Sequence, residues 1–152
     1  MVRGLYAILA ALVLVLPATS TAGTTSHQQA VVQEMNRVRT EHGLPALQFD
    51  DHLQRAAVAH SREMLVNDVF QHGAFSNRLQ RYNVQSRIAG ENLAWGTGSM
   101  GTARAIVSAW LASPEHRANL LRTSFSRVGV GDLTGSFQGH TGAHVVTADF
   151  AG

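Results

Sequence analysis

The hydrophobic pattern of this chain changes its period near residue 127. Upstream of that point apolar residues recur at helical spacing, as Val31, Met35 and Val38 do at i, i+4 and i+7. Downstream, residues 128–132 and 144–150 alternate with the period of two that is typical of strands. Helices followed by strands favour an α+β fold, with helices packed on a small antiparallel sheet.

Capping and stop signals delimit the predicted helices. The first covers residues 27–41 and ends at Gly43 before Pro45, and Asp50 is a good N-cap for the second. A third helix begins after Thr102 and ends at Ser113-Pro114, and a short helix then continues to about Arg122. The buried stripe of the second helix is predicted to be Leu53, Ala56, Ala57, His60 and Met64.

The remaining segments have weaker patterns. Residues 67–87 are predicted to form a long ordered loop, with a short helical turn over residues 77–82. Residues 90–96 favour a short strand between glycines, and residues 98–101 a turn. The turn-rich residues 135–142 predict that the last two strands form a hairpin.

The first 22 residues have the layout of a signal peptide. Arg3 precedes an unbroken apolar run over residues 5–16, followed by Pro17 and small residues up to Ala22. This run is shorter than the roughly 20 residues that a membrane-spanning helix requires. We expect cleavage near Gly23, one domain over residues 23–152 and a secreted or periplasmic mature chain without a membrane span; an uncleaved anchor is the alternative.

The composition argues against two classes of protein, the disulfide-stabilised extracellular scaffold and the nucleic-acid-binding protein. The chain has no cysteine and can form no disulfides, so an exported form would depend on its hydrophobic core for stability. Its 12 basic residues, all arginine, are balanced by 10 acidic ones, and they form no basic tract. We therefore expect no nucleic-acid partner.

Eight histidines are the main candidates for chemistry. Imidazole is both a common metal ligand and the usual acid or base near neutral pH. His72 and His116 lie among small polar residues in a predicted loop and at a predicted helix start, where functional groups concentrate. The others are expected to be surface residues (His27, His42, His52 and His140) or structural residues (His60 and His144).

An ordered series of motifs resembles the bacterial branch of the CAP superfamily, which includes cysteine-rich secretory proteins, antigen 5 and plant pathogenesis-related proteins. The resemblance extends over nearly all of residues 23–152. The motifs are Asn36 with Arg39, Gly43-Leu44-Pro45-Ala46-Leu47, Ala59-His60 with Met64, Gln71-His72, Gly90-Glu91-Asn92-Leu93-Ala94, Trp110 with Ser113-Pro114-Glu115-His116-Arg117-Ala118-Asn119, Val128-Gly129-Val130-Gly131 and Val146-Thr147-Ala148-Asp149-Phe150.

This resemblance implies a secreted three-layer α-β-α sandwich with an open cleft. It matches His72, Glu91 and His116 to cleft residues that can hold a divalent metal such as zinc, and Asn36 and Arg39 to structural positions. Ser113 stands where many eukaryotic relatives have a second cleft glutamate, so the ligand set is incomplete. The alternative is that these groups organise the cleft by hydrogen bonds through water.

Two function classes follow from the resemblance. The first is a non-catalytic extracellular binding module that recognises a cell-envelope, lipid or protein ligand. The second is a metal-dependent hydrolase with Glu91 or His72 as general base, or, less favoured, a dyad of Ser113 and His116. The sequence contains neither G-x-S-x-G nor H-E-x-x-H, which favours the binding module.

Overall fold

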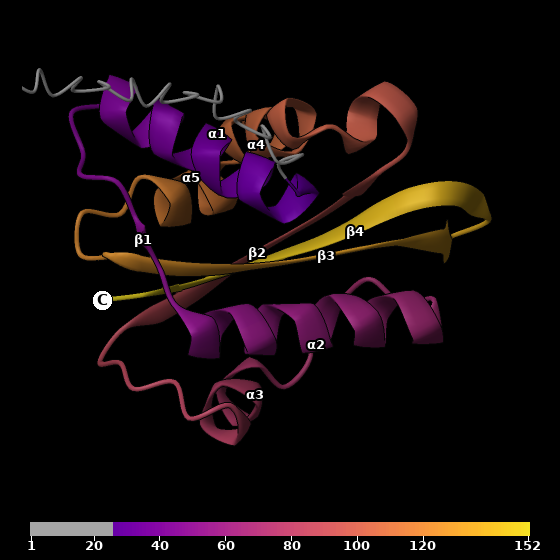
Figure 1. Cartoon of the computed structure of the whole chain (residues 1–152), viewed down its shortest axis with the longest axis horizontal. Helices are drawn as coiled ribbons and strands as arrows, with labels where there is room; N and C mark the ends of the chain where they lie inside the picture. Colours follow the sequence, from indigo (N-terminus) through magenta and orange to yellow (C-terminus); the bar gives the residue numbers. More distant parts are fainter. Residues whose placement is uncertain (1–25) are drawn as a thin grey trace, which may run out of the picture.

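The computed structural model of this chain describes residues 26–152 and shows three layers (Figure 1). The predicted signal peptide, residues 1–22, lies outside this part. A central sheet is covered by helices on both faces, which confirms the predicted α+β three-layer sandwich. One face carries α1 (His27–Glu41), α4 (Ala103–Ala112) and α5 (Pro114–Leu120), and the other carries α2 (Asp51–Asn67) and α3 (Phe75–Arg81).

The helices begin where their capping residues predict. The Ser26 side chain accepts from the Gln29 amide and starts α1, and Asp50 accepts from the amides of His52 and Leu53 at the start of α2. Thr102 caps α4 in the same way through the Ala105 amide. A short 3₁₀ turn, η1 (Gly98–Gly101), precedes α4 at the predicted turn.

The sheet has the order β1-β3-β4-β2 and is mixed, whereas the sequence pattern predicts a purely antiparallel sheet. Its strands are β1 (Gln48–Phe49), β2 (Ala89–Gly96), β3 (Arg127–Phe137) and β4 (His140–Ala151). The pairs β3–β4 and β4–β2 are antiparallel, but β1 runs parallel to β3. A strand of two residues is too short to show alternation, which is why sequence reasoning missed it.

The hairpin turn is shorter than predicted. β3 continues to Phe137 and β4 begins at His140, so the turn consists of Gln138 and Gly139 instead of residues 135–142. Both turn residues have positive φ, 51° and 77°, as tight two-residue hairpins require. Gly135 and Gly142, which look like turn residues in the sequence, lie inside the strands.

The predicted loop over residues 67–87 contains one regular element. α3 occupies Phe75–Arg81, so the predicted turn over residues 77–82 is confirmed as a helix that begins two residues earlier. Leu79 and the partly buried Phe75 pack in a cluster with Leu53 and Ala56 of α2. This packing stabilises α3, although seven residues alone are too few for a stable helix in water.

Glycines let α2 lie directly against β3. A Cβ atom on Gly129 would come 2.0 Å from the Gln54 amide nitrogen, and one on Gly131 would come 2.2 Å from the Ala57 carbonyl oxygen. Real Cβ atoms do not approach backbone this closely, so the glycines determine the spacing of these two layers.

Candidate functional site

Strand β2 is the edge strand of the sheet next to β4, and it carries the Gly-Glu-Asn motif. Successive residues of a strand point to opposite faces of the sheet. Glu91 pairs in register with Asp149 of β4 and contacts Arg78 of α3, whereas Asn92 bonds to α5 on the other face. The edge of β2 is therefore where groups from the two helical layers meet.

Glu91 is the centre of this arrangement. Its side chain is only 3% exposed, and its Oε1 lies 2.7 Å from Nδ1 of His72. Its Oε2 forms an ion pair with the guanidinium of Arg78, which is itself buried. Arg78 also donates to the His72 carbonyl over 3.3 Å. Both carboxylate oxygens thus have a protein partner.

His72 is held at one nitrogen and accessible elsewhere. Its side chain is 57% exposed, although Nδ1 contacts the buried carboxylate of Glu91. A carboxylate at Nδ1 orients an imidazole and leaves Nε2 as the atom able to bind a ligand. The loop before His72 is fixed by His60, whose Nε2 lies 2.8 Å from the Gln71 carbonyl oxygen. His60 is 1% exposed, which confirms its predicted structural role.

His116 approaches from the other layer, on the first turns of α5. Its carbonyl accepts from Asn92 Nδ2 over 2.9 Å, which ties α5 to β2. Burial lowers the pKa of His116, the positive charge of a protonated His72 lowers it further, and Glu115 partly opposes these effects. The structure therefore joins His72 directly to Glu91 and ties His116 to the same strand through its backbone carbonyl, but donor atoms of His72, Glu91 and His116 do not all lie within 4.8 Å of one another. We call these residues and Arg78 the edge cluster.

Ser113 lies at the junction of α4 and α5, where it ends one helix and precedes Pro114 at the start of the next. Its side chain makes no capping hydrogen bond to α5. Within the described part of the chain, no hydrogen bond joins its hydroxyl to the ring of His116, as a catalytic dyad would require.

Sequence reasoning missed two charged groups of this region, Arg78 and Asp149. Asp149 is fully buried in β4, and neither of its carboxylate oxygens has a hydrogen-bond partner. Burial raises the pKa of Asp149 well above its ordinary value, the charge of Glu91 raises it further, and Arg78 opposes this. Asp149 belongs to one of the family motifs, but the motif does not indicate that its carboxyl lies near Glu91, and Arg78 has no distinguishing sequence signal; only the folded structure shows these neighbours.

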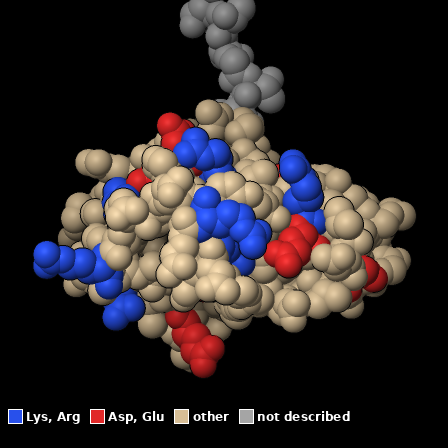
Figure 2. All heavy atoms as spheres, turned by 90° about the horizontal axis from the view of Figure 1, so that it is seen from below, with Lys and Arg blue, Asp and Glu red and all other residues tan. Residues whose placement is uncertain are grey.

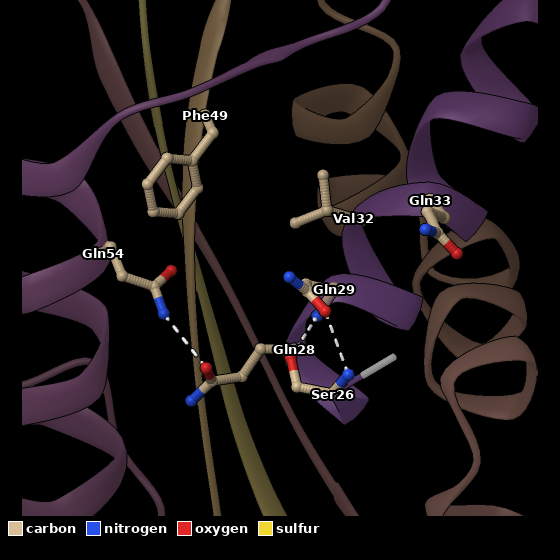
Figure 3. A pocket seen from close by; sticks show the side chains of 7 residues that line it. All are labelled: Ser26, Gln28, Gln29, Val32, Gln33, Phe49 and Gln54. Carbon is tan, nitrogen blue, oxygen red and sulfur yellow. Dashed lines mark hydrogen bonds between the residues drawn. The ribbon is translucent and has the colours of Figure 1, made fainter. Parts of the chain in front are cut away.

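A separate hollow of about 490 Å³ lies between the start of α1 and the start of α2 (Figure 3). Its lining is uncharged: Ser26, Gln28, Gln29, Val32, Gln33, Phe49 and Gln54. Gln54 donates to the Gln28 side chain across the hollow over 3.2 Å, and Phe49 is 59% exposed. The polar side chains of the lining can form hydrogen bonds with amide or hydroxyl groups of a ligand, and Val32 and Phe49 can contact its apolar groups.

Charges on the α2 and α3 side of the molecule are mixed. Figure 2 shows arginine side chains distributed over this face with acidic side chains among them.

Between residues 26 and 152, no helix has the length and hydrophobicity needed to cross a membrane.

Comparisons with known proteins agree with this architecture. Residues 32–150 match the sequence model of the cysteine-rich secretory protein family, CAP. The uncharacterized protein YkwD of Bacillus subtilis is 31% identical over 115 residues, which are 72% of this chain and 44% of that protein. The chain spans less than half the length of the two curated relatives it matches.

Solved structures show the same fold. An extracellular protein of Bacillus anthracis that contains an SCP domain superposes with a TM-score of 0.69 and 32% identity, over 82% of this chain and 40% of the other. An outer surface protein of Borrelia burgdorferi superposes with a TM-score of 0.67 and 23% identity, over 79% and 87% of the two chains. The second likeness shows the fold alone.

Proposed function

The chain belongs to the cysteine-rich secretory protein (CAP) family, and on that premise we propose that it is a secreted binding module whose edge cluster holds a divalent metal. The module comprises residues 23–152 after removal of the signal peptide. It recognises a ligand outside the cytoplasm, either an envelope component, a lipid or a protein. Ser113 lies beside this site without a direct role in binding the metal.

The observation that carries the proposal is the contact between His72 Nδ1 and Glu91 at 2.7 Å, with Glu91 anchored by Arg78. Histidine ligands of metals usually have their second ring nitrogen on a carboxylate, which fixes the ring and raises its basicity. The edge cluster has this arrangement on an accessible histidine. Glu91 then acts through His72, since both of its oxygens are engaged.

His116 supplies the second nitrogen. Metal ligands must be deprotonated, and the lowered pKa of His116 favours its neutral form. Two imidazoles with water in the remaining positions suit zinc, and a bound zinc ion would supply a Lewis acid for a carbonyl or anionic group of the ligand. A site with two protein ligands is expected to bind zinc reversibly.

The geometry argues against Glu91 as the general base of a hydrolase. A general base needs a free lone pair within hydrogen-bond reach of the water that it activates. Glu91 is 3% exposed and its two oxygens already contact His72 and Arg78, so its carboxylate is poorly placed to reach a substrate water. This leaves the exposed His72 and the neighbouring surface to contact a ligand.

Zinc titration of the full chain tests the proposal. We expect the double variant His72→Ala/His116→Ala to lose one equivalent of bound zinc relative to the wild type, with an unchanged circular dichroism spectrum. His52→Ala is the matched control, because His52 is an exposed histidine on α2. An unchanged zinc stoichiometry and affinity in the double variant would refute the metal site.

A further inference from the structure

A second group of metal-binding side chains lies far from His72 in the sequence, on the face of the hairpin that α1 covers. His144 of β4 pairs in register with Thr134, two residues along β3 from Asp132, so Asp132 and His144 are diagonal neighbours on one face; His27 is the first residue of α1. One donor atom from each of the three residues lies within 4.8 Å of the other two. We call these residues the hairpin cluster.

The distances converge on the carboxylate. His144 Nδ1 is 3.0 Å from Oδ1 and 3.2 Å from Oδ2 of Asp132, and His27 Nδ1 is 2.5 Å from Oδ2. The two imidazole rings lie against each other with centroids 4.2 Å apart. Donor atoms at about 2.0–2.2 Å from a tetrahedral zinc ion are about 3.4 Å apart, so small side-chain rotations would place the three around one ion.

The carboxylate of this group is buried, and its partners are histidines. The Asp132 side chain is 4% exposed, and its ion-pair partners in the described residues are the two histidines, with no arginine among them. Both ring nitrogens of His27 are buried and lack a hydrogen-bond partner, because the close contact to Asp132 is not aligned as a hydrogen bond. Buried carboxylates and buried ring nitrogens need a partner.

We infer that His27, Asp132 and His144 form a second divalent-metal site, of the zinc type and separate from the edge cluster. Two imidazoles and one carboxylate are a donor set that zinc prefers, and a water molecule would complete four-coordination. The ion would bind the carboxylate of Asp132 and one of the two ring nitrogens of His27 that lack a hydrogen-bond partner among the described residues. The inference stands on these contacts alone and does not depend on the proposed function.

The site would also join the start of α1 to the sheet. Gln28, the next residue, already donates to the Asp132 carbonyl over 3.4 Å, and Gln54 of α2 donates to Gln28 (Figure 3). A metal bound by His27 would add a strong link at the point where the helix begins. We therefore expect metal binding to raise the thermal stability of the chain.

The test uses the full chain with His72→Ala/His116→Ala as background, so that only the hairpin cluster remains to be measured. We expect this background to bind one equivalent of zinc, and cobalt in the same site to give the visible absorption of a four-coordinate ion. Adding Asp132→Asn or His27→Ala should weaken zinc binding by at least about 100-fold, since loss of a ligand exceeds the loss of an outer-shell partner. His140→Ala, which removes an exposed histidine of the same hairpin, should leave it unchanged.

A measurement on the unmodified chain covers the case in which a variant fails to fold. Zinc should shift the ring signals of His27 and His144 in nuclear magnetic resonance spectra and raise the melting temperature, and a chelator should reverse both effects. Unshifted signals, or a background that binds no zinc, would overturn the inference and leave the three residues as a hydrogen-bonded structural group.

Discussion

The edge cluster and the hairpin cluster use the same residue types, two histidines and a buried carboxylate, in different electrostatic settings. In the edge cluster, Arg78 supplies a permanent positive charge to Glu91, so the carboxylate is neutralised and serves to orient His72. In the hairpin cluster, Asp132 has only imidazoles as ion-pair partners among the described residues. The presence of Arg78 is the difference between the two clusters. Glu91 is paired with an arginine and positions a histidine, whereas Asp132 has no arginine partner within residues 26–152 and is the carboxylate that we propose binds a metal.

Removing the arginine should have the largest effect. Arg78→Ala leaves the buried Glu91 without its cation, and breaking a buried ion pair in this way costs about 3–5 kcal/mol. Urea unfolding at neutral pH measures this loss. Adding Glu91→Gln should recover part of it, because the uncompensated charge is then removed. The matched control Arg55→Ala, at an exposed arginine of α2, should change stability by less than about 0.5 kcal/mol; an equal loss in both variants would contradict the comparison.

Removing the second carboxyl beneath the edge cluster should have an intermediate effect that depends on pH. The pKa of Asp149 in the folded chain is raised by burial and by Glu91, so the folded state keeps a proton that the unfolded state releases above about pH 3.8. Stability therefore falls as pH rises from there through the folded-state pKa, by at most about 1.4 kcal/mol per pH unit.

Asp149→Asn cannot titrate, so its stability relative to the wild type should increase with pH over this window and then level off. Urea unfolding at a series of pH values measures the difference, with Asp51→Asn, at an exposed position of α2, as the control. A difference that is constant over the whole pH range would show that folding does not raise the pKa of Asp149.

The smallest effect concerns the coupling between the two histidines of the edge cluster. Burial lowers the pKa of His116 most, and the charge of His72 adds to this. In His72→Ala the second cause is absent, so the pKa of His116 should rise but stay below that of an exposed histidine. A titration of the His116 ring followed by nuclear magnetic resonance measures the change, and no change would mean that the two rings do not interact.

Local sequence signals predicted most of the fold. The stripe of Val31, Met35 and Val38 and the stop at Gly43 predicted the observed bounds of α1, because periodicity and caps act within a few residues. The hairpin was predicted as a pair of strands, but its turn was misplaced, since Gly135 and Gly142 look like turn residues although they lie in strands. The strand β1 was missed because it depends on its contact with β3.

The candidate site was predicted in part. The family resemblance, now confirmed, matched His72, Glu91 and His116 to cleft positions; the structure joins His72 to Glu91 and ties His116 to the same strand through its backbone carbonyl. His144 was expected to be a structural residue and does contact Asp132, whereas His27 was expected to be a surface residue and contacts the same carboxylate. Helical position alone could not show this, because the partner of His27 lies more than 100 residues away.

The sequence by itself determined most of the helices, the two long C-terminal strands and the family to which the chain belongs, because periodicity, capping and ordered motifs are local or additive along the chain. Only the tertiary structure decided which charges meet. Arg78 contacts Glu91 from α3, which the sequence predicted only as a short helical turn, and His27 of α1 contacts Asp132 of β3 in the neighbouring layer. Electrostatic interaction depends on distance and burial in space, and neither is recorded in the spacing of residues along the chain.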